Sequence, residues 1–124
     1  MSARILYVED NPQNMDLVCR ILTHVGGYEV FGAVDGLSGV DKALAELPDL
    51  IIMDINLPDI SGLEATNRIK ANPQTSKSPI PAFTANITEN DRTSFADAGC
   101  DGYMSKPASA QILLDVVSDY LTAS

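Results

Sequence analysis

The chain has 124 residues, of which 45% are hydrophobic and 20% charged, so it is long enough for one domain with a sizeable core. Seventeen acidic residues against eight lysines and arginines give a net charge of −9, which repels phosphate backbones and anionic lipids and argues against nucleic acid and membrane surfaces as partners. No apolar run approaches the roughly 20 residues of a membrane span, no signal-peptide layout is present, and two cysteines are too few for a disulfide framework, so we expect a reduced, cytoplasmic, single-domain protein.

Short apolar segments alternate with segments of helical periodicity, five times along the chain. The first apolar segment, residues 5–8, precedes a helix with Asn11 as its N-cap and Pro12 in its first turn, which Gly26-Gly27 ends. The apolar residues of this helix, which we expect to face the core, are Met15, Val18, Ile21, Leu22 and Val25.

The second strand is expected over residues 28–34, with Val34 among its apolar positions. Asp35-Gly36 then opens a helix that Pro48 closes. The apolar positions of this helix are Val40, Ala43, Leu44 and Leu47. The third strand, residues 50–54, is a nearly continuous apolar run that ends in Asp54.

A loop over residues 55–60 leads to a helix that begins with a capping box of Ser61 and Glu64 and carries Leu63, Thr66 and Ile69. Residues 72–79 are polar and rich in turn formers, which predicts a surface loop. The fourth strand is expected over residues 80–84. Because prolines precede and interrupt its start, we expect its pairing to begin late.

The helix after the fourth strand, about Glu89–Ala98, is expected to be capped by Thr88 with Asp91, and its thin apolar stripe predicts a loosely held element. The fifth strand follows at Gly102–Ser105. The last helix has the clearest periodicity, with apolar residues at Ile112, Leu113, Val116, Val117, Tyr120 and Leu121.

Strands that are apolar on both faces, each followed by a helix, predict an α/β fold. We expect a five-stranded parallel sheet in a three-layer α/β/α sandwich of the flavodoxin-like type, with strand order 2-1-3-4-5. In such sheets, ligands bind at the carboxyl ends of the strands, near the point where the strand order reverses.

Polar residues stand at those carboxyl ends: Glu9-Asp10, Asp54, Thr84 and Lys106. Because strands one and three are expected to be neighbours, the three carboxylates should lie in one pocket, where they repel one another unless a cation is present. Oxygen-only ligands favour Mg²⁺, with Mn²⁺ able to substitute, and such a site is suited to a phosphoryl group.

Asp54 is the natural nucleophile of this pocket, because a carboxylate that attacks phosphorus forms an aspartyl phosphate. Lys106 would neutralise a phosphate oxygen, and the Thr84 hydroxyl would donate to another. No histidine stands at these strand ends, so the phosphoryl group must come from another molecule. Taken singly, Asp10 could be a helix cap, Asp54 the start of a loop and Lys106 a solvated lysine; their conjunction at one edge favours a site.

These residues, with the segments Glu9-Asp10-Asn11, 53–58, Gly62, Thr84-Ala85 and Lys106-Pro107, resemble the receiver domain of two-component response regulators. The resemblance covers about residues 3–121. The length of the chain, 1–124, matches one receiver domain without an output domain. It is closest to the single-domain CheY-like regulators of chemotaxis or the cell cycle, and residues 8–15 favour the DivK-like branch.

The resemblance implies that Asp54 accepts a phosphoryl group from a histidine of a sensor kinase or of a histidine phosphotransfer protein. Mg²⁺ would be bound directly by Asp10, Asp54 and the backbone carbonyl of Asn56, with Glu9 acting through water. Lys106 would contact the phosphoryl group, with a cis bond to the following Pro107.

The resemblance further implies a switch made of Thr84 and Tyr103, whose movement repacks the face formed by helix 89–98, strand 102–105 and the last helix, where a downstream protein docks. Asn56 and Asn86 would tune hydrolysis of the aspartyl phosphate. Such a protein is a signalling switch, and it catalyses only its own phosphorylation and slow dephosphorylation.

Three other hypotheses remain. A magnesium phosphatase of the haloacid dehalogenase type needs Asp-x-Asp-x-Thr, whereas the segment here is Asp54-Ile55-Asn56-Leu57-Pro58. A receiver-like module that never takes phosphate typically lacks one of the acids or the lysine, and none is missing here. A receiver domain excised from a hybrid histidine kinase or a larger regulator would have identical chemistry.

Overall fold

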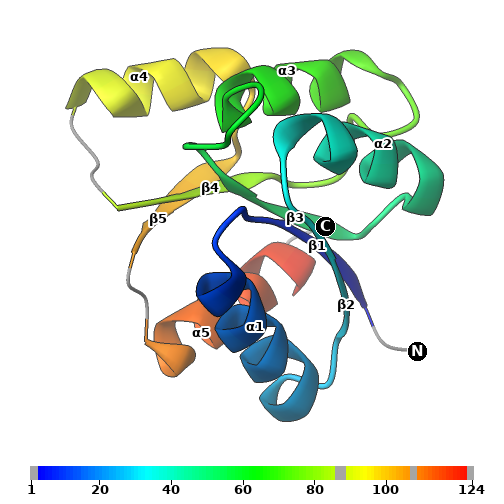
Figure 1. The fold of residues 1–124 in the computed structure, drawn as a ribbon, viewed down its shortest axis with the longest axis vertical. Helices are drawn as coiled ribbons and strands as arrows, with labels where there is room; N and C mark the ends of the chain where they lie inside the picture. Colours follow the sequence, from blue (N-terminus) through cyan, green and yellow to red (C-terminus); the bar gives the residue numbers. More distant parts are fainter. Residues whose placement is uncertain (1–2, 86–88, 107–108, 123–124) are drawn as a thin grey trace.

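Five strands form one parallel sheet in the computed structural model, which describes residues 3–85, 89–106 and 109–122 (Figure 1). The strands are Arg4–Val8 (β1), Glu29–Ala33 (β2), Leu50–Asp54 (β3), Pro81–Thr84 (β4) and Gly102–Ser105 (β5). They lie in the order β2-β1-β3-β4-β5, and every neighbouring pair is parallel. The predicted fold class and strand order are confirmed.

Helices cover both faces of this sheet. They are Pro12–Arg20 (α1), continued by the π-helical turn Ile21–Val25 (η1), Gly36–Glu46 (α2), Gly62–Ala71 (α3), Glu89–Ala98 (α4) and Ala110–Thr122 (α5). Helices α1 and α5 lie on one side of the sheet, and α2, α3 and α4 lie on the other (Figure 1). In the described ranges, every helix is too short or too polar to span a lipid bilayer.

Two hydrophobic clusters hold the layers together, one on each face of the sheet. Along β1, Ile5 and Tyr7 pack with residues of α1 and α5, whereas Leu6 and Val8 pack with residues of α2 and α3. All five residues of β3 are buried, as expected for a central parallel strand.

The helix starts follow the predicted capping residues. The Asn11 side chain accepts hydrogen bonds from the first amides of α1, and Asp35 caps α2 in the same way. Ser61 Oγ accepts from the amide of Glu64 at 3.1 Å. The capping box is only half formed, however, because the Glu64 carboxylate pairs with Arg68 one turn later. The predicted pairing of Thr88 with Asp91 lies outside the described residues.

The prediction that Val25 faces the core is wrong, because 69% of its surface is exposed. The chain winds into the π-helical turn η1 before it reaches Gly26. A π turn holds more residues than an α turn, so it rotates the residues that follow away from the apolar stripe. Leu22, at the start of this turn, stays fully buried.

Three further residues predicted on apolar stripes are exposed: Val34, Leu47 and Ile112. Val34 lies beyond β2, which ends at Ala33. Leu47 is the C-cap of α2 in a left-handed conformation with φ of 48°, so it has left the helical stripe. On α5, Leu113 and Val117 are buried instead of Ile112. Strand β4 begins at Pro81, one residue later than the apolar run, as the prolines predicted.

Candidate functional site

The carboxyl edge of the sheet gathers the polar residues that the sequence placed at the strand ends. Asp54 is the last residue of β3, and Thr84 is the last residue of β4. Glu9 follows β1, and Lys106 follows β5, where its backbone amide donates to the Thr84 carbonyl at 2.8 Å. The order β1-β3-β4-β5 brings these ends together at one edge.

Three carboxylates form the floor and rim of the site. Oxygen atoms of Glu9, Asp10 and Asp54 all lie within 4.8 Å of one another. Glu9 and Asp54 are buried, with 1% and 4% of their surfaces exposed, whereas Asp10 is exposed. A cluster of negative oxygen donors that is open to solvent on one side fits the ligand preference of Mg²⁺, so the residues present suit this ion.

One lysine forms ion pairs with two buried carboxylates. Lys106 Nζ lies 2.5 Å from Glu9 Oε1 and 3.3 Å from Asp54 Oδ2, and only 17% of its side chain is exposed. The same ammonium group lies 5.4 Å from the centre of the Phe83 ring. Lys106 is therefore held over the acidic pair and bonds more closely to Glu9.

The pKa values of the two buried carboxyls are pushed apart. Burial, reinforced by the neighbouring charge of Glu9 and only partly offset by Lys106, raises the pKa of Asp54 to about 6. Burial also opposes ionisation of Glu9, but hydrogen bonds with Lys106, Asp54, Tyr7 and the Asn11 amide outweigh it, and the pKa of Glu9 falls to about 2. Asp54 is thus the carboxylate that lacks a full counter-charge.

The loop between β3 and α3 carries Asn56 and is anchored at several points. The Asn56 amide lies 3.4 Å from Asp54 Oδ1. The Gly62 amide donates to the Ile55 carbonyl at 2.8 Å, and a Cβ atom on Gly62 would overlap the carbonyl oxygen of Asp54. Asp59 accepts from two amides at the start of α2, those of Gly36 at 2.7 Å and Leu37 at 2.8 Å. Asn56 itself is exposed.

The two residues predicted to act as a switch have different environments. Thr84 is buried, with 5% of its surface exposed, whereas Tyr103 is 42% exposed. The Tyr103 ring packs against Phe95 of α4 at a centroid distance of 6.3 Å, and the Arg92 guanidinium lies 5.1 Å from its centre. Asn86 and Pro107, for which the family resemblance implies hydrolysis tuning and a cis bond, lie outside the described residues.

The sequence interpretation did not identify two residues that contact the site. The apolar pattern presents Tyr7 only as a strand residue, but its hydroxyl donates to Glu9 Oε1 at 2.8 Å, and burial raises the pKa of Tyr7 well above the usual range. The two-residue period of a strand places Tyr7 and Glu9 on one face, which is a signal that could have revealed this bond. No sequence signal marks Asp59 as the anchor of the loop.

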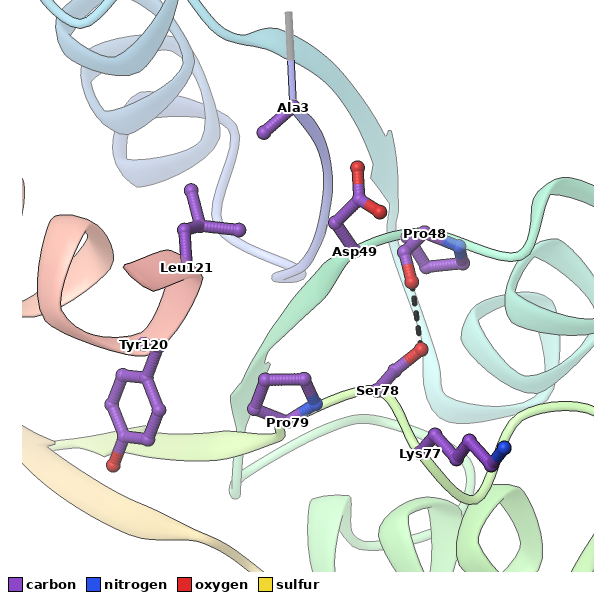
Figure 2. Close-up of a pocket in the computed structure, with 8 residues that line it drawn as sticks. All are labelled: Ala3, Pro48, Asp49, Lys77, Ser78, Pro79, Tyr120 and Leu121. Carbon is purple, nitrogen blue, oxygen red and sulfur yellow. Dashed lines mark hydrogen bonds between the residues drawn. The ribbon is translucent and has the colours of Figure 1, made fainter. Parts of the chain in front are cut away.

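Cavities differ between the two edges of the sheet. Beside the acidic cluster, a cavity of about 330 Å³ is lined by Tyr7, Asn14, Leu17, Val18, Phe83, Ala85 and Lys106. Another, of about 340 Å³, lies at the opposite edge between the start of β1, the loops before β3 and β4, and the end of α5 (Figure 2). Its lining includes one carboxylate, Asp49, and one amine, Lys77, and within the lining Ser78 Oγ donates to the Pro48 carbonyl. The buried carboxylates of the described residues, Glu9 and Asp54, lie at the carboxyl edge, beside the first of these cavities.

Comparison with known proteins shows the family that the chain matches. Residues 5–118 match the response regulator receiver domain family. Over 121 residues, the sequence is 38% identical to the polar-differentiation response regulator DivK of Brucella ovis, with 98% of both chains covered.

Solved structures agree with this match. The chemotaxis protein CheY4 of Vibrio cholerae superimposes with a TM-score of 0.93 at 28% identity, over 98% of this chain and all of the other. The receiver domain of the sensor histidine kinase PA1611 from Pseudomonas aeruginosa gives a TM-score of 0.90 at 34% identity over 98% of each chain. That structure has a magnesium ion coordinated in its active site cleft.

Proposed function

Because the chain belongs to the response regulator receiver domain family, we propose that Asp54 accepts a phosphoryl group and thereby switches the protein between two signalling states. Over nearly its whole length, the protein is similar to DivK and CheY response regulators, which are signalling switches rather than enzymes in the usual sense. In this proposed function, residues 1–124 form one receiver domain. The alternative, a receiver domain excised from a hybrid histidine kinase or a larger regulator, would use the same chemistry, and the receiver domain of the sensor histidine kinase PA1611 is among the similar structures.

The placement of Asp54 carries this proposal. Its carboxylate stands at the end of a buried strand, within 4.8 Å of two other carboxylates, with the Lys106 ammonium 3.3 Å away. A nucleophilic oxygen, an amine and a cluster of metal-binding oxygens at one point are the groups that phosphoryl transfer to a carboxylate requires. The buried Thr84 hydroxyl at the end of the neighbouring strand is a further donor for a phosphoryl oxygen.

In the proposed reaction, an oxygen of Asp54 attacks the phosphorus of a phosphohistidine on a partner protein. The new O–P bond forms as the N–P bond breaks, and the imidazole leaves with the electron pair and takes up a proton. Lys106 and Thr84 bind oxygens of the transferred group. Water later attacks the same phosphorus, the O–P bond breaks, and inorganic phosphate leaves the Asp54 carboxylate behind.

Receiver domains bind Mg²⁺ at an acidic site, and the acidic cluster of this chain suits that ion. The proposed ligands are Asp10, Asp54 and the backbone carbonyl of Asn56, with Glu9 acting through water and with Mn²⁺ able to substitute. When bound, the ion supplies positive charge that offsets the charge of the phosphoryl oxygens.

The proposed phosphodonor is a sensor histidine kinase or a histidine phosphotransfer protein, and the proposed output is a downstream protein that docks on α4, β5 and α5. Thr84 and Tyr103 form the proposed switch, while Asn56 and Asn86 tune the lifetime of the aspartyl phosphate. The free cysteines Cys19 and Cys100 fit a reducing compartment, which supports a cytoplasmic location.

Intact-mass measurement tests the assignment of Asp54. With Mg²⁺ and acetyl phosphate, the mass of the wild-type protein should rise by one phosphoryl group, and that of Asp54→Asn should not. Asp49→Asn, which makes the same change at the opposite edge of the sheet, should be phosphorylated like the wild type. Phosphorylation that survives Asp54→Asn would refute the acceptor, and a wild-type protein that never gains the mass would favour a module that works without phosphate.

A further inference from the structure

Tyr7 places one polar atom at the base of the acidic site. Its side chain is fully buried in β1, and its ring packs at a centroid distance of 6.2 Å from that of Phe83. The hydroxyl donates to Glu9 Oε1 at 2.8 Å. A phenylalanine would fill the same space in this hydrophobic cluster, so packing alone does not account for the hydroxyl group.

Glu9 is a buried carboxylate with three donors. Its Oε1 atom accepts from both Tyr7 and Lys106, and its Oε2 atom accepts from the Asn11 amide at 3.2 Å. Two of these donors belong to fixed parts of the fold, namely a central strand and the start of α1. The third, the Lys106 ammonium, is at the end of a flexible side chain and lies 3.3 Å from Asp54 as well.

Phosphorylation of Asp54 gives the Lys106 ammonium group a new anionic partner. In the proposed function, Lys106 also binds an oxygen of the phosphoryl group on Asp54, which draws its ammonium group away from Glu9. A buried carboxylate that loses a charged donor without compensation is strongly destabilised. The Tyr7 hydroxyl is placed to remain on Oε1 when the ammonium group moves.

We propose that Tyr7 is a positioning residue for phosphoryl transfer, whose hydroxyl holds Glu9 in place while Lys106 moves from Glu9 onto the phosphoryl group. This inference rests on the proposed function, because it takes Asp54 as the acceptor. Without the hydroxyl, Glu9 would retain Lys106 more firmly, and the transfer step would slow.

The test compares Tyr7→Phe with the wild type in the rate of phosphorylation by acetyl phosphate at saturating Mg²⁺. We expect the maximal rate to fall about tenfold, since a hydrogen bond to a buried charge is lost when the transferred group is bound. The concentration of acetyl phosphate that gives half the maximal rate should change little, because Tyr7 does not contact the donor. Circular dichroism establishes that the variant is folded.

A matched control is Tyr120→Phe. It also removes a phenol hydroxyl that makes a hydrogen bond, to the Asp101 carbonyl at 3.3 Å, but at the opposite end of β5. This variant should keep the wild-type rate. A double-mutant cycle then tests whether Tyr7 acts through Glu9, because Tyr7→Phe should have no further effect once Glu9→Gln has removed the buried charge.

The possible results distinguish a failure of the proposed function of Asp54 from a failure of the role proposed for Tyr7. If wild-type protein gains no phosphoryl group at Asp54, the proposed function fails. If the wild type is phosphorylated but folded Tyr7→Phe reacts within twofold of it, the role of Tyr7 is refuted and the function stands. An equal loss in Tyr120→Phe, or an undiminished effect of Tyr7→Phe in the Glu9→Gln background, would likewise contradict the role assigned to Tyr7.

Discussion

Asp54 and Glu9 share a single lysine, and this imbalance gives the two carboxyl groups opposite effects on how stability depends on pH. The pKa of Asp54 rises from 3.8 to about 6 through burial and the charge of Glu9, so the folded protein binds more protons than the unfolded chain between pH 4 and 6. The contribution of Asp54 to the free energy of unfolding therefore falls as the pH rises through this window. The lowered pKa of Glu9 acts in the opposite direction, and its contribution is lost as the pH falls from 4.5 towards 2.

Asp54→Asn should therefore stabilise the metal-free protein at pH 7. We expect a gain on the order of 2 kcal/mol in the free energy of unfolding, because the amide removes a buried charge that lacks a full counter-ion. Thermal unfolding in the presence of a chelator, from pH 4.5 to 7.5, measures it. The difference between the two proteins should grow with pH and shrink when Mg²⁺ is added. If the difference in stability between wild type and Asp54→Asn does not change with pH, the predicted charge imbalance is contradicted.

At the residue scale, the meeting of polar residues at the strand ends could be predicted from the sequence, because a parallel sheet places the carboxyl ends of its strands at one edge. An acid, a hydroxyl and a lysine that each end or follow an apolar run must meet at one edge once the strand order is known. The bond between Tyr7 and Glu9 was not predicted, because a tyrosine in an apolar strand is usually explained by packing alone. The two-residue period of the strand, which places Tyr7 and Glu9 on one face, is the signal that favours the hydrogen bond.

At the element scale, the loop between β3 and α3 is fixed to α2 by one carboxylate. Asp59 accepts from the amides of Gly36 and Leu37, which are free donors at a helix start. These two bonds from an ionised group are charge-assisted, and backbone hydrogen bonds from both amides lower the pKa of Asp59, although burial opposes it. Asp59 thereby holds the segment that presents Asn56 to the acidic cluster.

Asp59→Ala should weaken Mg²⁺ binding without removing a proposed ligand. We expect the dissociation constant to rise about tenfold, since residues that orient metal ligands typically contribute this much. Isothermal titration calorimetry measures it. The control is Asp41→Ala, which makes the same charge change at an exposed position of α2. If both variants bind Mg²⁺ equally, net charge and not the position of the loop sets the affinity.

The elements themselves were predictable, but their ends were not. Apolar runs and helical periodicity predicted the strands β1–β5 and the helices α1–α5 that the described residues form. The pattern did not predict that α1 winds into the π turn η1, or that Leu47 caps α2 in a left-handed conformation. Both depend on how the chain turns to begin the next strand, which is a tertiary constraint outside the local sequence.

At the scale of the whole molecule, β4 and β5 connect the acidic site to the face formed by α4, β5 and α5. Thr84 ends β4 and pairs in register with Ser105, two residues after Tyr103. The Tyr103 ring lies outward against Phe95 and Arg92 of α4. Movement of the Thr84 hydroxyl towards a phosphoryl group would free space beneath β5, and an exposed aromatic ring gains apolar contact by entering it.

Thr84→Ala should therefore uncouple binding of a phosphoryl mimic from the response of Tyr103. In wild-type protein with Mg²⁺ and beryllofluoride, we expect changes in the amide resonances of Asp54 and also of Tyr103 and Phe95. In Thr84→Ala, the mimic should still perturb Asp54, but the shift at Tyr103 should fall by about half or more, because no hydroxyl moves to link the two sites. The control is Thr23→Ala, the same truncation at an exposed position of η1, which should leave all three responses intact. A full shift at Tyr103 in Thr84→Ala would show that the signal reaches the face of α4, β5 and α5 by another route, such as the Lys106 side chain.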